Sequence, residues 1–337
     1  MEAVKGSMPS PEKIFQIFNA YQQTASLKAA IELDVFTALA EGNNTAKALA
    51  ERCQTSERGM RILCDYLVII GLLNKQNGHY DLTPESAVFL NRRSPACISS
   101  VVKFLNSPYV MDTFKDVAGV VRRGGTLMGE EGSMAPEHPM WEEFARSMAP
   151  MMAPAAQMIA EIVGEGDWKV LDIAAGHGLF GIAIAKRNPK AQIFALDWPN
   201  VLKVALENAQ AAGVADRYHT IAGSAFEVEY GSDYDTVLLT NFLHHVDTGT
   251  CENLLRRVHR ALKSGGRAVT LEFIPNEDRV SPPAAAAFSL MMLAGTPSGD
   301  AYTFSEYDRM FTAAGFSRSE LHPLPNMPQQ VIVSYKE

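Results

Sequence analysis

Hydrophobic and polar residues follow two different patterns along the chain. Over the first hundred residues, apolar side chains recur at the spacing of amphipathic helices, as in the run from Ile14 to Leu27. After residue 168, short apolar segments alternate with helical patterns. Alternation of this kind is typical of a parallel sheet with helices on both faces. The pattern therefore predicts a mainly helical region followed by an α/β domain.

The helical region also carries the signal of a small hairpin, since Asn77-Gly78 marks a tight turn between two apolar segments within 73–82. Three helices are predicted before it, over 11–27, 45–52 and 56–73. Helix, turn, helix and hairpin is the order of a winged helix. The change in pattern gives three regions: a winged-helix-like domain over 1–105, a helical connector over 106–164, and the α/β domain over 165–337.

The α/β domain is predicted to hold a Rossmann-like, mostly parallel sheet of seven strands. The strands are expected at 169–174, 192–196, 218–222, 236–240, 267–273, 318–323 and 330–335. Helices are expected at 179–187, 201–212, 249–262 and 305–314. The last two strands follow each other closely enough to pair as a hairpin, which gives the sheet an antiparallel edge.

Composition and charge exclude several classes of protein. The net charge is −8, and residues 1–105 hold eleven Lys and Arg against ten Asp and Glu, so a nucleic-acid partner is not expected. No apolar run approaches the roughly 20 residues of a membrane span, and the first ten residues lack a secretion signal. The four cysteines have no CxxC spacing, which indicates reduced thiols in a cytoplasmic protein. No His, Asp or Cys cluster indicates a metal ion, so we expect the enzyme to work without a metal.

A glycine-rich loop follows the first strand of the α/β domain, in the segment VLDIAAGHGLFG from Val170 to Gly181. Gly176 and Gly178 let the backbone turn tightly and approach a ligand, with helix amides pointing at it. Asp197, 19 residues after Gly178, ends the second strand, where a carboxylate binds ribose hydroxyls. Both nicotinamide dinucleotides and S-adenosyl-L-methionine suit this pattern.

Asp172 favours one of the two cofactors. A carboxylate just before the loop would repel a pyrophosphate, whereas S-adenosylmethionine carries an ammonium and a sulfonium that it would attract. The alternative is a structural carboxylate that holds the amides of the loop.

Candidate chemistry follows the fourth strand, where His244 and His245 occur next to each other. Ligands of open α/β sheets bind at the carboxyl ends of the strands, and a histidine is a suitable base for an acidic hydroxyl. A purely structural role remains the alternative for each of them. Soft apolar side chains predict a pocket for a flat or apolar acceptor: Met148, Met152, Phe288, Met291 and Met292.

Nearly the whole chain resembles the small-molecule O-methyltransferases that include the caffeic acid and hydroxyindole O-methyltransferases. VLDIAAGHG is similar to the first cofactor motif of that family, FALDWPNVL to its second, and IAGSAFE to its third. The resemblance implies a class I methyltransferase fold behind a dimerisation domain. It also implies that Asp197 holds the ribose and that Trp198 and Phe226 flank the adenine, with further cofactor contacts from Ser224, Ala225 and Asn241.

The resemblance further assigns the catalytic base to His244 and its orienting partner to Glu272. Two positions depart from the family. Ser224 stands where many relatives have aspartate, and Ala301 stands where plant relatives have a second glutamate, with Asp300 beside it.

These observations lead to a methyltransferase that moves a methyl group from S-adenosylmethionine to a small acceptor, with a hydroxyl oxygen favoured over sulfur or carbon. The apolar N-terminal helices predict a homodimer. A nicotinamide oxidoreductase and a non-catalytic winged-helix sensor of S-adenosylmethionine are the alternatives from other classes.

Overall fold

The computed structural model describes residues 9–337, and the chain forms two compact units that divide between Val102 and Lys103. The predicted connector, 106–164, belongs to the second unit. The beginning of the region predicted over 1–105, and most of the segment expected to lack a secretion signal, lie outside the described residues.

The first unit is a small helical domain with one hairpin. Its elements are α1 (Glu12–Phe18), α2 (Ala20–Glu32), α3 (Val35–Ala40), α4 (Ala46–Arg52), α5 (Glu57–Ile69), β1 (Leu73–Gln76), β2 (His79–Leu82) and α6 (Pro84–Phe89). The side chains of Thr45 and Ser56 accept hydrogen bonds from backbone N–H groups and so begin α4 and α5. Phe36, Leu49 and Tyr80 lie in its core.

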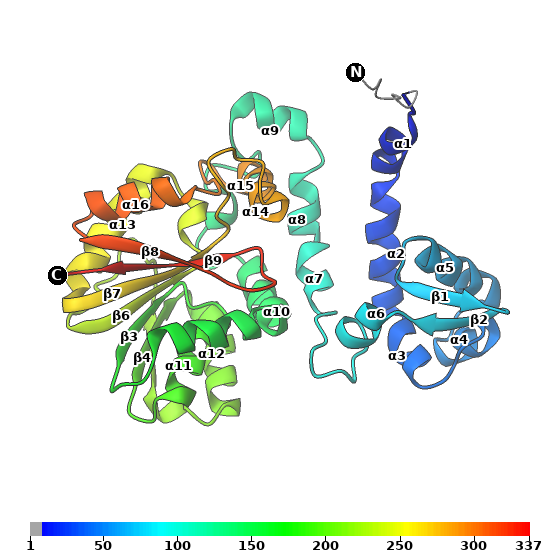
Figure 1. Ribbon diagram of the computed structural model, residues 1–337, viewed down its shortest axis with the longest axis horizontal. Coiled ribbons are helices and arrows are strands. Elements are labelled where there is room, and N and C mark those ends of the chain that lie inside the picture. The colour runs from blue at the N-terminus through cyan, green and yellow to red at the C-terminus, as the bar shows by residue number, and fades with distance from the viewer. Residues whose placement is uncertain (1–8) are drawn as a thin grey trace, which may run out of the picture. The chain divides into compact units, whose positions relative to one another are not determined.

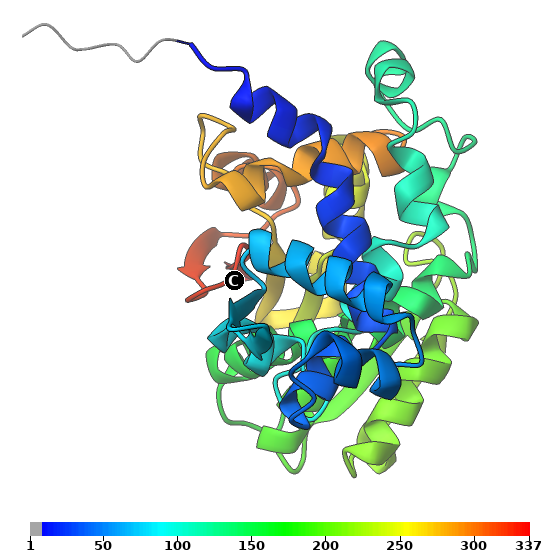
Figure 2. The same cartoon turned by 90° about the vertical axis from the view of Figure 1, so that its right-hand side faces the viewer.

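The predicted helix over 11–27 is two helices, because the chain leaves helical geometry at Asn19. None of the residues of α1 is buried, and α1 projects away from the hairpin and from α3 to α5 in both views (Figures 1 and 2). Its apolar side chains, Phe15 and Phe18 among them, are therefore exposed.

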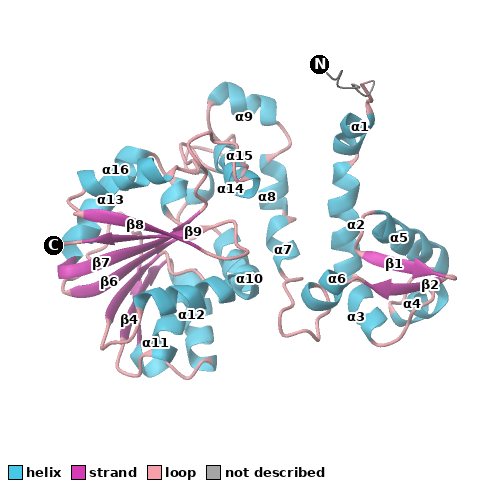
Figure 3. Ribbon diagram, in the orientation of Figure 1, coloured by secondary structure: helices cyan, strands magenta, loops and turns pink. Residues whose placement is uncertain are grey.

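The second unit holds a seven-stranded sheet (Figure 3). The strands lie in the order β5 (Tyr218–Ala222), β4 (Gln192–Asp197), β3 (Lys169–Ile173), β6 (Tyr234–Thr240), β7 (Leu262–Glu272), β9 (Gln330–Tyr335) and β8 (Arg318–Pro323). The first five run parallel, and β9 is antiparallel to both β7 and β8. The predicted fold class, with its antiparallel edge, is confirmed.

Helices cover both faces of this sheet (Figure 1). The face shared by Val170, Ile193 and Val331 packs against α10 (Met140–Val163), α11 (Leu179–Arg187) and α12 (Pro199–Ala211). The face shared by Leu171 and Leu239 packs against α13 (Thr248–Ala261) and α16 (Phe304–Ala313). Because successive strand residues point to opposite faces, each strand contributes to both cores.

Shorter helices complete the fold. They are α7 (Val101–Leu105), which spans the division between the two units, α8 (Pro108–Thr113), α9 (Val117–Arg123), α14 (Pro283–Ala286) and α15 (Phe288–Gly295). Single 3-10 turns occur at η1 (Gly132–Met134), at η2 (Ala215–Arg217) before β5, and at η3 (Leu243–His245) after β6. Within residues 9–337, no helix combines the length and the apolar character needed to cross a membrane.

Candidate active site

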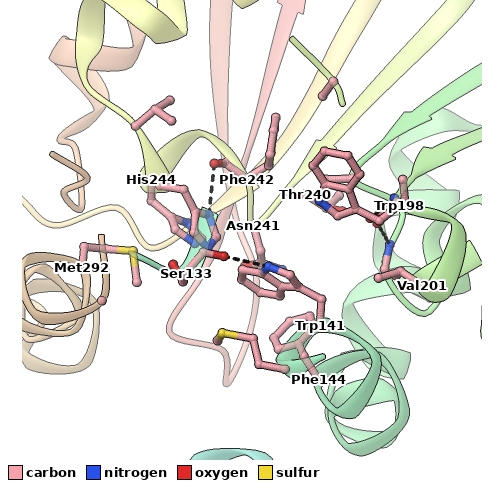
Figure 4. Close-up of a pocket in the computed structure, with 18 of the residues that line it drawn as sticks. Ser133, Trp141, Phe144, Trp198, Val201, Thr240, Asn241, Phe242, His244 and Met292 are labelled. Atoms are coloured by element: carbon pink, nitrogen blue, oxygen red, sulfur yellow. Dashed lines mark hydrogen bonds between the residues drawn. The ribbon is translucent and has the colours of Figure 1, made fainter. Parts of the chain in front are cut away.

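One large cavity, of about 920 Å³, lies at the carboxyl ends of the parallel strands. Thirteen of the predicted site residues line it: Met148, Met152, Gly176, Asp197, Trp198, Ser224, Ala225, Phe226, Asn241, His244, Phe288, Met291 and Met292. Figure 4 shows how several of the lining side chains converge from helix α10 and from the ends of the strands. Asp172, Gly178 and Glu272 do not line the cavity.

The glycine loop between β3 and α11 uses its two glycines differently. Gly176 has a φ of +56° and faces the cavity, where an added Cβ would have no heavy-atom neighbour nearer than 3.9 Å. Gly178 has a φ of +75°, and a Cβ there would lie 2.5 Å from the Tyr218 hydroxyl. Gly178 is therefore required for packing of the loop against Tyr218 and does not itself line the cavity, and its contact with the cofactor stays a prediction.

Asp197 ends β4 and lies at the cavity wall. Its Oδ2 accepts a hydrogen bond from the backbone N–H of Gly176 at 2.8 Å, and its Oδ1 accepts one from the backbone N–H of Trp198 at 2.7 Å. Burial raises the pKa of Asp197 to about 6. Each oxygen keeps a lone pair, so the carboxylate has capacity for hydroxyl donors in the cavity.

Asp172 lies elsewhere than predicted. It is fully buried beneath the loop, where its Oδ2 accepts a hydrogen bond from the Gly181 backbone N–H at 3.2 Å and its Oδ1 has no partner. Burial raises the pKa of Asp172 to about 7. The side chain shares a sheet face with Val170, two residues earlier, and so points toward α11. This geometry corrects the expectation of direct cofactor contact and matches the structural alternative.

The segment after β5 also lines the cavity, from Gly223 to Glu227. The Ser224 hydroxyl oxygen accepts a hydrogen bond from the Phe226 backbone N–H at 3.2 Å, so this residue shapes the turn in which relatives carry aspartate. The Phe226 ring lies 5.8 Å from that of Phe242, centroid to centroid. Trp198 lines the same region from the start of α12.

His244 is held by a buried carboxylate. Glu272, at the end of β7, is fully buried, and its Oε1 accepts hydrogen bonds from the backbone N–H groups of Phe242 and Leu243 at 3.0 and 2.9 Å. Its Oε2 is hydrogen-bonded to His244 Nδ1. Since Nδ1 is engaged, Nε2 is the ring nitrogen that His244 offers to the cavity it lines.

His245 also lines the cavity but has no carboxylate partner. Its Nδ1 lies 3.2 Å from the Phe242 carbonyl oxygen. Burial and the adjacent His244, whose ring centroid is 4.2 Å away, lower the pKa of His245 well below its usual range. His245 is therefore a neutral imidazole that donates a hydrogen bond from Nδ1.

Aromatic side chains that the sequence analysis missed complete the wall. Consecutive ring contacts, with centroid distances of 3.9 to 5.6 Å, join residues of α7, α10, η3, α15 and the segment after β7. In order they are Phe104, Phe144, Trp141, His245, His244, Phe288 and Phe273. Trp141 is fixed by a hydrogen bond from its Nε1 to the Ser133 carbonyl oxygen at 2.8 Å. Helical aromatic spacing could have signalled Trp141 and Phe144, whereas Phe104 is too distant in sequence.

The second glutamate of plant relatives has no substitute beside His244. Ala301 is fully buried, and the carboxylate of Asp300 pairs with Arg279 at 3.2 Å. No lysine or arginine occurs among the described residues that line the cavity. Residues 9–337 contain no group of three or more His, Cys, Asp or Glu side chains suited to a metal.

This fold and cavity are those of a class I methyltransferase. Residues 151–317 match the O-methyltransferase domain, and residues 15–92 match the O-methyltransferase dimerisation domain. The crystal structure of a candidate O-methyltransferase from Nostoc punctiforme is 57% identical, with a TM-score of 0.95 and coverage of 98% of this chain and 100% of that one. The chain belongs to the O-methyltransferase family.

Relatives of lower identity agree. The 3-hydroxy-5-methyl-1-naphthoate 3-O-methyltransferase of Streptomyces sahachiroi is 29% identical, with coverage of 91% of this chain and 90% of the relative. Human N-acetylserotonin methyltransferase, solved in complex with S-adenosylmethionine, has the same fold, with a TM-score of 0.84 at 22% identity over 99% of each chain. The choice that the glycine pattern left open is thereby resolved, since enzymes of this family take S-adenosylmethionine.

Proposed function

We propose that this enzyme methylates a hydroxyl oxygen of a small, flat and largely apolar acceptor, with His244 as the base that takes the hydroxyl proton. The observation that carries the proposal is the buried Glu272–His244 pair on the wall of a cavity lined by aromatic and methionine side chains. Glu272 touches His244 but not the cavity, so it is a positioning residue.

The hydrogen bonds of Glu272 determine which nitrogen acts as the base. Two backbone amides and the imidazole donate to this carboxylate, so the proton of His244 resides on Nδ1 and Nε2 keeps its lone pair. Nε2 takes the proton of the acceptor hydroxyl as the oxygen attacks. The carboxylate then stabilises the imidazolium that forms.

The cofactor end of the cavity fits S-adenosylmethionine. When bound, S-adenosylmethionine would supply a methyl group on a cationic sulfur, whose carbon bonds to the acceptor oxygen as the carbon–sulfur bond breaks and S-adenosylhomocysteine leaves. Gly176 leaves open space beside the loop, and Asp197 keeps lone pairs for ribose hydroxyls. Trp198 and Phe226 provide aromatic faces for the adenine. Ser224, Ala225 and Asn241 complete this part of the wall.

The acceptor end favours flat molecules without an anionic group. Met148, Met152 and Met292 are almost fully buried, and their flexible thioethers adapt to apolar rings. The chain of aromatic rings offers edges and faces at which a second ring system packs well. Without a lysine or arginine among the described lining residues, a carboxylate would enter unpaired.

Mass spectrometry with a deuterium-labelled methyl donor tests the proposal. 2-Naphthol and 2-naphthalenethiol present the same ring to the site with a different nucleophile, and a broader panel of aromatic hydroxyls extends the comparison. The expected products carry the label on oxygen. Products labelled mainly on sulfur or carbon would contradict the proposal and support methyl transfer to those atoms on the same scaffold.

We also propose that two copies of the chain associate through the helices of residues 1–105. The match to a dimerisation domain over 15–92 supports this, as do exposed apolar side chains on α1 and at the start of α2. These are Ile14, Phe15, Ile17, Phe18 and Tyr21, each more than half exposed. Sedimentation velocity at micromolar concentration should give twice the mass of the chain, and a monomeric mass would contradict the proposal.

We propose no nucleic-acid partner, and a cytoplasmic location. On α5, Arg61 pairs with Asp65 at 2.8 Å, and Glu57 precedes Arg58, so this helix carries acidic as well as basic side chains and is unlike the basic face of a DNA reader. All four cysteines are free thiols, which suits a reducing compartment.

A further inference from the structure

The turn that carries His244 packs against a second segment of the chain at a single glycine. Gly299 lies in the loop between α15 and α16, and a Cβ atom placed on it would lie 2.2 Å from the carbonyl oxygen of His244 and 2.9 Å from the carbonyl carbon of His245. Such distances are far inside van der Waals contact, so a side chain at this position would displace the backbone of η3. The φ of Gly299 is outside the left-handed region, so the close approach alone requires glycine.

Buried hydrogen bonds keep the loop in this position. The hydroxyl of Thr296, which is fully buried, accepts from the Gly299 backbone N–H at 2.8 Å and donates to the Met292 carbonyl oxygen at 2.7 Å. After Gly299, the hydroxyl of Tyr302 donates to the carbonyl oxygen of Val246 at 2.7 Å. The loop is therefore joined to α15 on one side of Gly299 and, on the other side, to the residue that follows η3.

A third segment also confines the loop. A Cβ atom on Gly125 would lie 2.4 Å from the Pro297 carbonyl oxygen, and the Thr126 backbone N–H donates to the Thr296 carbonyl oxygen at 2.9 Å. This segment therefore packs against the loop backbone to backbone. Because α15, η3 and this segment all hold the loop, a methyl group added at Gly299 has to act on the neighbouring backbone of η3.

His244 thus has two supports of different kinds. Glu272 holds the ring at Nδ1, whereas the loop limits where the main chain of His244 can lie. We propose that Gly299 sets the position of the His244 imidazole and so acts as a positioning residue for methyl transfer, because only a residue without a side chain lets the loop pack against η3. The part of this inference that concerns methyl transfer rests on the base proposed above.

Proton NMR without any acceptor tests the position of the imidazole. The Nδ1 proton of His244 is donated to a buried carboxylate, so it should give a downfield resonance that is absent from His244→Ala. Gly299→Ala should shift or remove this resonance. The variant should bind S-adenosylhomocysteine within about twofold of the parent, because Gly299 does not line the cavity. A resonance that stays at the parent's position would overturn the proposal.

Gly295→Ala is the matched control for the resonance. It adds the same methyl group earlier in the same segment, at a position where no heavy atom lies within 4 Å of the new Cβ. The His244 resonance should therefore stay where it is in the parent. A shift equal to that of Gly299→Ala would mean that the close approach at Gly299 has no special role, and the proposal would be wrong.

The kinetic test measures Gly299→Ala in two backgrounds. In the parent it should lower kcat by about 10- to 100-fold, the scale for displacing a catalytic group by about 1 Å. In His244→Ala it should cause less than about twofold further loss, because the ring that it positions is gone. The same loss in both backgrounds would assign the effect to the stability of the fold and contradict the proposal. Near-normal turnover by His244→Ala would instead contradict the proposed base, and the resonance alone would then decide whether Gly299 positions the imidazole.

Thr296 offers a second pair of variants, which also serves if Gly299→Ala does not fold. Thr296→Val removes the hydroxyl that holds the Gly299 N–H, whereas Thr296→Ser keeps it. The valine variant should shift the His244 resonance and lower kcat by about two- to tenfold, the range for one hydrogen bond, and the serine variant should restore both. Identical behaviour of the two variants would overturn the proposal.

Discussion

The two halves of the cavity are built from different kinds of groups. The half that we assign to the cofactor consists mainly of strand ends and loop backbone, as at Gly176, to which the carboxylate of Asp197 and the rings of Trp198 and Phe226 are added. The half that we assign to the acceptor consists of side chains from α10, α15 and η3, with His244 as its polar centre. The shape of the cofactor half is therefore determined mainly by the backbone, whereas the shape of the acceptor half depends on the individual side chains. Variants should divide accordingly into those that alter cofactor binding and those that alter turnover.

The largest effect is expected at His244. His244→Ala removes the proposed base and should lower kcat by about 10²- to 10⁴-fold, while the Kd for S-adenosylhomocysteine stays within about twofold. Glu272→Gln should lower kcat more mildly, because the imidazole stays but loses its carboxylate. Steady-state kinetics with an acceptor from the screen, combined with calorimetry, measure both quantities. Near-normal turnover by His244→Ala would mean that the acceptor arrives already deprotonated.

His245→Ala is the control for this experiment. It removes the neighbouring neutral imidazole and should affect kcat less than His244→Ala does. A larger loss at His245 would transfer the role of base to that residue.

Asp197 should give the largest effect on the cofactor half. Asp197→Ala is expected to weaken binding of S-adenosylhomocysteine by about 1.5–3 kcal/mol, the range for hydrogen bonds to a charged group. Because burial raises the pKa of Asp197 to about 6, the carboxylate that accepts from the ribose is present above that pH and is lost below it. The affinity of the parent should therefore fall between pH 7 and pH 5. A Kd that is the same for parent and variant would show that Asp197 does not hold the cofactor.

Asp172 should affect the stability of the fold and not the binding of the cofactor, because it is buried outside the cavity. Its pKa of about 7 lies above the ordinary value of 3.8, so the folded protein binds this proton more tightly than the unfolded chain does. Stability should therefore fall as the pH rises from about 4 to 7. Asp172→Asn avoids burying a charge and should raise the free energy of unfolding by roughly 1–3 kcal/mol at pH 8 and little at pH 5.

Urea denaturation at both pH values measures this difference for Asp172→Asn. Binding of S-adenosylhomocysteine to the same variant should be within about twofold of the parent. A tenfold loss of affinity would restore Asp172 to the cofactor site.

The smallest effect is expected in the acceptor wall. Met292→Leu conserves volume but exchanges a flexible thioether for a branched side chain, which should change the KM for the acceptor by about two- to fivefold. Met310→Leu, at a buried methionine of α16 that does not line the cavity, is the control and should leave KM unchanged. Equal changes in KM for the two substitutions would mean that Met292→Leu acts through the stability of the fold and not through contact with the acceptor.

The contrast between the halves also explains what the sequence could predict. Strand β5 has the predicted bounds of 218–222, and the glycine loop follows β3 as expected, since short-range patterns determine both. The direction of Asp172 was predictable in principle, because a strand period of two puts it on the same face as Val170. The break at Asn19 has no such signal, since neither glycine nor proline marks it.

Residues brought in from distant segments could not be predicted in the same way. Phe104 and Gln329 are separated by more than 200 residues and still line one cavity. Their places depend on how α7 and the loop before β9 pack over the sheet, and no spacing rule within the sequence encodes that packing.

The placement of the tryptophans gives the cavity an optical property. Trp141 and Trp198 line it, whereas Trp168 lies outside, with its Nε1 donating to the Gly164 carbonyl oxygen at 3.1 Å and its ring beside Arg267. Two of the three indoles therefore border the space that a ligand would occupy, against a constant background from the third. The intrinsic fluorescence of the enzyme is thus expected to report occupancy of the cavity, and substituting each indole alone shows which of the two responds to the cofactor.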